Sequence, residues 1–157
     1  DRSIDVAPAT FVSEARKTLL ADADRNPGGD LVLIGRRQLL SNNSWMHNSQ
    51  RSMRGHERFT LLVHPDDAHR RGLKTGTRVR LESSAGAITV PIEISSTMMP
   101  GVVSLPHGWG HDREGIRLTV AGQHPGASMN DVTSESHLDT LSGNAAFNGV
   151  VVRVQPA

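Results

Sequence analysis

The sequence predicts a mainly β domain that forms a barrel with inserted loops. Two observations lead to this fold class: at least five short segments have the pattern of strands, and long helical patterns are few. Gly, Pro, Asn and Ser clusters separate these segments, as turns do. A length of 157 residues with 36% apolar content is enough for one hydrophobic core.

The first 30 residues are expected to form a lead-in strap with a short helix, ahead of a barrel domain at residues 31–157. A helix over residues 11–23 is predicted because apolar side chains recur at helical spacing, at Phe11, Ala15 and Leu19. Thr10 is the expected N-cap, and the Pro and Gly residues between Arg25 and Asp30 are expected to end the element.

Short apolar or alternating segments predict the strands of the barrel: Leu31–Gly35, Phe59–Val63, Arg78–Ser83, Ala87–Ile94, Val102–Pro106 and Val150–Val154. Ser84-Ala85-Gly86 has the residues of a hairpin turn. His64-Pro65-Asp66 begins a predicted short helix over residues 65–71, with Gly72 as its stop. One further helical turn is expected near residues 133–138.

A long polar segment, Arg36 to Arg58, follows the first predicted strand. A loop of this length in a compact domain is usually functional or disordered. From Leu31 to His56 the chain has no Asp or Glu, while Arg36, Arg37, Arg51 and Arg54 all fall there. Arginines and amides without carboxylates suit a ligand that carries phosphate. The alternative is an ordinary basic loop that faces water.

Composition excludes several classes of function. The chain has no cysteine, which excludes disulfides and a cysteine-ligated iron–sulfur cluster within it. A net charge of +1 and 3% aromatic residues argue against nucleic-acid binding. No apolar run reaches the roughly 18 residues of a membrane span. No export signal is visible, so a cytoplasmic location is the default expectation.

His107 and His111 stand four residues apart, a spacing that on a helix can bind zinc. Gly108, Gly110 and Pro106 make a helix there unfavourable, and no Glu lies between the histidines to act as a base. A hydrolase is also disfavoured, because the G-x-S-x-G elbow is absent. We therefore expect neither a metal site nor catalytic residues in this chain.

Three polar, Gly-containing segments beside apolar strands have the composition expected where backbone approaches a ligand closely: Gly35 to Asn48, Pro100 to Gly110, and Met129 to Thr133 with Phe147-Asn148-Gly149. Their order, with His64-Pro65-Asp66-Asp67-Ala68 and Gly72-Leu73-Lys74-Thr75-Gly76 between the first two, resembles one family. It is the molybdopterin-dinucleotide-binding domain that ends enzymes of the dimethyl sulfoxide reductase family, which includes formate dehydrogenases and nitrate reductases. The similarity runs from about Leu31 to Val154.

The resemblance implies a double-psi β-barrel of the aspartate-decarboxylase-like type that covers part of a bis(molybdopterin guanine dinucleotide) cofactor. The cofactor-binding residues that it implies are Gly35, Arg36, Ser41, Trp45, His47, Asn48, His107, Asn130 and Asn148. If Arg36 and Arg37 continue the strand, they point to opposite faces.

The resemblance also implies that this chain works with the catalytic N-terminal domains of the same enzyme, which supply the ligand of the molybdenum or tungsten. By itself the chain is therefore expected to be inactive. Residues 139–144 lack the prolines found in many relatives, so the last loop is expected to differ. A different function for the same barrel is a protein-interaction module, like the substrate-recruiting barrels of AAA ATPases.

Overall fold

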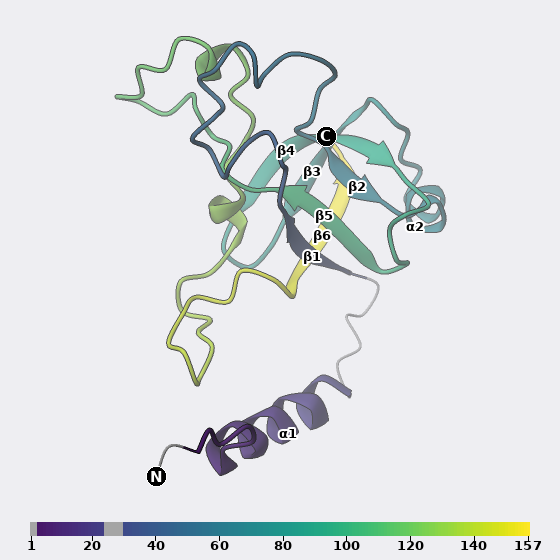
Figure 1. The fold of residues 1–157 in the computed structure, drawn as a ribbon. Helices are drawn as coiled ribbons and strands as arrows, with labels where there is room; N and C mark the ends of the chain where they lie inside the picture. Colours follow the sequence, from purple (N-terminus) through teal and green to yellow (C-terminus); the bar gives the residue numbers. More distant parts are fainter. Residues whose placement is uncertain (1–2, 24–29) are drawn as a thin grey trace.

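The computed structural model describes residues 3–23 and 30–157, without the side chains of residues 21–23, and its main body is a barrel (Figure 1). Within these residues the strands are β1 (Leu31–Arg36), β2 (Leu61–Val63), β3 (Arg78–Glu82), β4 (Ala87–Ile94), β5 (Val102–Pro106) and β6 (Val150–Pro156). They close in the order β1-β5-β2-β4-β3-β6. The pairs β1·β5 and β2·β4 are parallel and the other neighbours are antiparallel. The prediction of a mainly β, double-psi barrel with a few short helices is confirmed.

Alternation along the strands fills the barrel interior. In β3, buried Val79 and Leu81 alternate with exposed Arg78 and Arg80, the pattern that a strand with one covered face requires. The strand residues with no exposed surface are Leu33, Leu61, Val63, Val79, Leu81, Val90, Val103 and Leu105. Burying each of them contributes on the order of 1.5–3 kcal/mol, which makes this interior the main source of stability.

Helix α1 (Ala9–Ala23) confirms the predicted helix, but its start differs from the expectation. The Val12 amide donates to the Pro8 carbonyl at 3.0 Å, so the helix begins before Thr10, and Thr10 is not its N-cap. Figure 1 shows α1 outside the barrel. The expected breaker lies almost wholly at residues 24–29, outside the described residues. The division between residues 30 and 31 stays a prediction.

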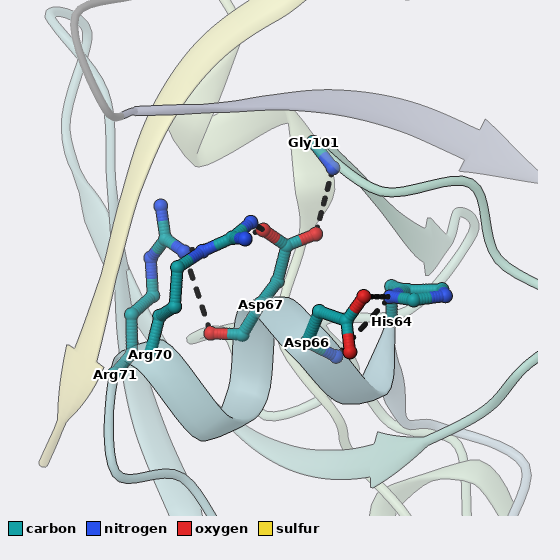
Figure 2. A network of polar contacts seen from close by, with 6 residues as sticks. All are labelled: His64, Asp66, Asp67, Arg70, Arg71 and Gly101. Carbon is teal, nitrogen blue, oxygen red and sulfur yellow. Dashed lines mark hydrogen bonds and ion pairs between the residues drawn. The ribbon is translucent and has the colours of Figure 1, made fainter.

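Helix α2 (Pro65–Arg70) begins where predicted and ends one residue before the predicted end, with Arg71 as its C-cap. The His64 ring caps it: Nδ1 accepts from the Asp66 amide at 3.2 Å, as Figure 2 shows. Pro65 occupies the first turn, where its missing N–H costs nothing. Gly72 follows the helix with a φ of +64°, a conformation that favours glycine.

A buried carboxylate joins α2 to the strands (Figure 2). Asp67 is 1% exposed and accepts from the Gly101 amide at 2.7 Å through Oδ2. Its Oδ1 lies 2.5 Å from Nη2 of Arg70 and 3.4 Å from Nη1 of Arg71. The Gly101 carbonyl in turn accepts from the Val32 amide at 2.9 Å. Asp67 therefore anchors the turn that leads into β5, beside the start of β1.

The helical turn expected near residues 133–138 lies earlier in the chain. Two short 3-10 helices are present, η1 (Ala121–Gln123) and η2 (Met129–Val132). The Ser128 side chain caps η2 by accepting from the Asn130 amide at 3.3 Å, which starts the turn there. Residues 133–138 contain no helix; they have a turn and, at Leu138, an isolated bridge to Ala145. Among the described helices, none is long and apolar enough to cross a membrane.

Two long insertions leave the barrel at the same end. Residues 37–58 follow β1, and residues 107–130 follow β5; we call them together the polar lobe. Because β1 and β5 are parallel and Arg36 pairs with Pro106, both chains emerge at one edge. Figure 1 shows the two insertions side by side at the upper left.

Candidate functional site

Hydrogen bonds from the Asn48 side chain and a close backbone crossing at Gly108 hold the two insertions of the polar lobe together. The Asn48 side-chain oxygen accepts from the backbone amides of Val120 at 2.9 Å and Ala121 at 3.2 Å. Gly108 has a φ of +89°, and a Cβ there would lie 2.7 Å from the Asn43 carbonyl oxygen. Only glycine fits this crossing without strain, because any other residue needs both the unfavourable φ and the missing space.

A buried pair of histidines forms the second contact between the insertions. Nδ1 of His47 and Nε2 of His111 lie 2.7 Å apart, and the two side chains belong to residues 1% and 8% exposed. The His47 ring also packs on Trp109, with ring centroids 4.1 Å apart, and Trp109 packs on Phe59 at 5.3 Å. These rings form the interior of the polar lobe, where it adjoins the barrel.

Burial keeps both histidines neutral at ordinary pH. It lowers the pKa of His47 from 6.5 to about 4, with further lowering by His111 and Arg58 and a small opposing effect of the Gly108 backbone. Burial also lowers the pKa of His111, against an opposing effect of Asp112. Burial acts this way because it disfavours the charged form of an imidazole.

A pocket of about 330 Å³ opens where the polar lobe meets η2 and the segment before β6. Its lining is mixed, with hydroxyl, amide and imidazole groups beside aromatic rings: Ser44, His107, Gly108, Trp109, His111, Ser128, Met129, Asn130 and Phe147. This volume lies at the small end of the range for small-molecule sites, so it suits one part of a large ligand.

The two neighbouring arginines have different environments, as their alternation on a strand predicted. Arg36 turns toward the barrel, where its guanidinium donates to the carbonyls of Ser104 at 3.0 Å and Thr60 at 2.8 Å. Burial lowers the pKa of Arg36, although Glu93 opposes this. Arg37 is exposed and donates to the Asn43 side-chain oxygen.

His107 connects this arginine to the pocket. Its Nε2 lies 2.9 Å from the same Asn43 oxygen that accepts from Arg37. Its ring makes an edge-to-face contact with Phe147, with centroids 5.6 Å apart. The exposed cation and the pocket lining are thus linked by direct contacts.

The segment before β6 closes the site from the other side. The Gly35 amide donates to the Asn148 side-chain oxygen at 2.7 Å. A Cβ on Gly35 would lie 2.3 Å from the ring of Phe147, so glycine is what lets this ring cover the strand end. Phe147 in turn reaches the pocket lining beside His107.

The structure places the predicted site residues in four environments. His107 and Asn130 line the pocket, and Gly35 and Asn148 meet beside it. Ser41, His47 and Asn48 make contacts within the polar lobe, and Arg36 lies against the barrel. Trp45 is 81% exposed. A cofactor contact by any of these residues stays a prediction.

Sequence reasoning did not single out Asn43, Ser44, His111 or Phe147 as site residues. Asn43, Ser44 and Phe147 lie inside the polar motifs selected for the site, and His111 belongs to a segment that is expected to be a structural or ligand-contacting turn rather than a metal site. In the structure His111 meets His47 rather than His107. The described residues include no cluster of three or more His, Cys, Asp or Glu that could hold a metal.

Residues 31–151 match the family model described as "Molydopterin dinucleotide binding domain". The matched range contains β1 to β5, both insertions of the polar lobe and the pocket. The match covers well over half of the chain, which is enough to identify the family.

Curated relatives include a tetrathionate reductase subunit of Salmonella typhimurium, 27% identical over 112 residues, which are 60% of this chain and 11% of that protein. Dimethyl sulfoxide reductase DmsA of Escherichia coli is 28% identical over 94 residues, again 60% of this chain and 11% of that protein. The molybdopterin-containing subunit of the arsenate respiratory reductase of a Shewanella species is 35% identical over 94 residues, which are 58% of this chain and 11% of that protein. The chain therefore spans about a tenth of the length of these relatives.

A solved structure of acetylene hydratase from Pelobacter acetylenicus has a similar fold, with a TM-score of 0.62 and 18% identity. The likeness covers 88% of this chain and 20% of that one. At this level of identity the likeness supports the fold alone, and it agrees with the closed barrel.

Proposed function

The chain belongs to the molybdopterin dinucleotide binding domain family, and on this basis we propose that its pocket binds the guanine dinucleotide end of molybdopterin guanine dinucleotide. One observation supports the location: three polar segments far apart in the sequence converge on one pocket at the ends of β1 and β5. None of the relatives named above suggests the alternative of a substrate-recruiting barrel.

The chemistry of the site matches that ligand. The exposed guanidinium of Arg37 stands in a segment without carboxylates, which suits the diphosphate. Asn130 and Ser44 offer amide and hydroxyl groups in the lining, and guanine has donors and acceptors in one plane to pair with them. Phe147 offers an apolar face next to these groups. Such a lining can fix the orientation of a base as well as its position.

In the complete enzyme, the bound cofactor carries molybdenum or tungsten and supplies the redox chemistry. The residues of this chain bind and orient the organic part of the cofactor. We therefore expect this chain alone to show no oxidoreductase activity. A cytoplasmic location also stays a prediction.

The proposed partner is the catalytic part of the same oxidoreductase. Large apolar side chains are exposed on the first turns of the polar lobe: Leu39, Leu40, Trp45 and Met46. Leu39 is 97% and Trp45 81% exposed, and apolar groups this accessible next to a ligand pocket are typical of contact surfaces. This surface is the proposed contact with the domains that complete the cofactor site.

Calorimetric titration of the chain with GDP at low salt tests the pocket. We expect weak binding, because the ligand is only one end of the cofactor, and loss of affinity as salt increases. Arg37→Ala should weaken binding about tenfold, the effect of one lost charge-assisted hydrogen bond. Asn130→Ala should weaken it less, since an amide makes a neutral hydrogen bond.

Arg54→Ala is the matched control, since Arg54 is an exposed arginine of the same insertion. It should change GDP affinity only slightly, through general charge. Arg36→Ala is expected to lower stability, because its guanidinium holds two barrel carbonyls. Equal effects of Arg37→Ala and Arg54→Ala, with none of Asn130→Ala, would contradict the proposed site.

A further inference from the structure

The hydrogen bond between His47 and His111 depends on their protonation. A distance of 2.7 Å between two ring nitrogens requires one N–H and one lone pair. Two neutral rings provide this arrangement, with one donating to the other. If both rings are protonated, both facing nitrogens carry an N–H and neither can accept a hydrogen bond. Protonation of both rings therefore breaks the contact that joins the two insertions.

The surroundings offer little to compensate a charge on the pair. Arg58 and His107 face His47 and disfavour a positive charge there, while Asp112 opposes the effect of burial on His111. Nε2 of His47 is buried without a hydrogen-bond partner among the described residues. In the protonated ring this nitrogen would be a buried donor without an acceptor, which is costly, and among the groups around His47 the Gly108 backbone is the one that favours the charge.

The pair also lies directly behind the ligand pocket. His111 and Trp109 line that pocket, and the His47 ring packs on Trp109. Ser44, which also lines it, is three residues from His47 along the chain. Separation of the two histidines would therefore move one wall of the pocket.

We propose that His47 and His111 are positioning residues that form a pH-sensitive latch between the two insertions. With neutral rings the latch keeps residues 37–58 against residues 107–130 and maintains the pocket; acidification releases the first insertion. The latch is a property of the polar lobe, and its effect on nucleotide binding rests on the proposed function.

The direction of the pH effect follows from the pKa values. Folding lowers the pKa of His47 from 6.5 to about 4, so the released state binds more protons between these values. The latch is complete above about pH 6.5 and weakens as the pH falls toward 4. His111, whose pKa is also lowered, adds to the effect in the same direction.

The two tryptophans allow a direct measurement of the latch. Trp45 is 81% exposed, whereas Trp109 is 5% exposed and packs on His47. In Trp45→Phe, all tryptophan emission comes from Trp109. We expect this emission to change intensity and shift to the red between pH 6.5 and 4, before the far-UV circular dichroism of the barrel changes.

Amide substitutions separate titration from hydrogen bonding. In His47→Asn with His111→Gln, amide groups take the places of Nδ1 and Nε2 and do not titrate. This double variant, in the Trp45→Phe background, should keep the emission of docked Trp109 and lose the pH transition. His69→Gln, which removes an exposed histidine on α2, should leave the transition unchanged.

Histidine NMR of the unsubstituted chain covers the case in which the double variant does not fold. Two of the eight histidines should titrate below 6.5, one of them with its midpoint near 4. The latch is refuted if both rings titrate at the ordinary value, or if Trp109 emission stays constant down to pH 4. A transition retained in a folded double variant refutes it as well.

GDP calorimetry at pH 7.5 and 5, with Trp45 present, connects the latch to the pocket. We expect affinity to fall roughly tenfold on acidification in the unsubstituted chain, and by less in the double variant. If the unsubstituted chain and the double variant lose GDP affinity equally on acidification, the latch does not act on the pocket. If the emission transition is present but GDP does not bind at either pH, the proposed function fails while the latch stands.

Discussion

The barrel and the polar lobe are stabilised in different ways. The barrel interior consists of apolar side chains that alternate along each strand, and neighbouring strands are joined by regular ladders. The polar lobe depends on individual contacts: the Asn48 oxygen, the glycine crossing at Gly108 and the His47–His111 pair. Asn42 and Asn43 there have φ values of 44° and 61°, a left-handed conformation that asparagine tolerates better than most residues.

This difference separates stability from ligand binding. Many equivalent apolar contacts stabilise the barrel interior, so few single polar groups matter to its stability; the buried Asp67 and the half-buried Arg36 are exceptions. In the polar lobe a few polar groups determine the shape of the pocket, so a small change there alters binding without unfolding the barrel. Three substitutions test this division.

Leu33→Ala should have the largest effect. Leu33 has no exposed surface and lies in β1 opposite Val103 of β5. Its truncation removes apolar burial and leaves a cavity, which should lower the free energy of unfolding by about 2–5 kcal/mol. Urea unfolding followed by circular dichroism measures the change. Leu39→Ala, at a position 97% exposed, is the control and should stay within about 0.5 kcal/mol. Similar effects of the two would contradict the assigned core.

Asp67→Ala tests how much a single buried polar group contributes to the stability of the barrel region. Removing this buried carboxylate leaves the Gly101 amide without its acceptor and takes an ion-pair partner from Arg70 and Arg71, and we expect a loss of about 2–4 kcal/mol in the free energy of unfolding. Asp66→Ala is matched in position on α2 but its side chain is 71% exposed, so it should cost less than about 1 kcal/mol. If Asp66→Ala costs as much, the helix terminus rather than the buried network is responsible.

Gly108→Ala should act on the polar lobe and leave the barrel folded. The added methyl needs a positive φ and meets the Asn43 backbone, which together cost about 1–3 kcal/mol of local stability. Hydrogen exchange should accelerate at residues 37–58 and stay slow in β3 and β4. Gly115→Ala has a similar φ of +86° but open space, so it measures the conformational cost alone. Uniform acceleration in both regions would mean that they unfold together.

Local sequence patterns were enough to predict the strands, the start of α2 and the glycine that follows it, and the three polar segments of the site. Alternation of apolar residues, Pro65 in a first helical turn and Gly72 after the last one are all read from neighbours in the chain. Thr10 shows the limit even for local signals. Helix α1 starts one residue ahead of that expected cap, because the backbone remains helical through it.

Which polar residues meet is settled only by the assembled barrel. His47 and His111 are 64 positions apart, and the sequence offers the first as a cofactor contact and the second as part of a possible metal site or turn, with nothing that pairs them. Arg36 and Arg37 have the same chemistry in the sequence, yet one binds barrel carbonyls and the other is exposed. Both outcomes follow from the parallel pairing of β1 with β5, which places two distant insertions at one edge of the barrel. Such pairing depends on the closure of the whole sheet, and no local pattern of residues encodes it.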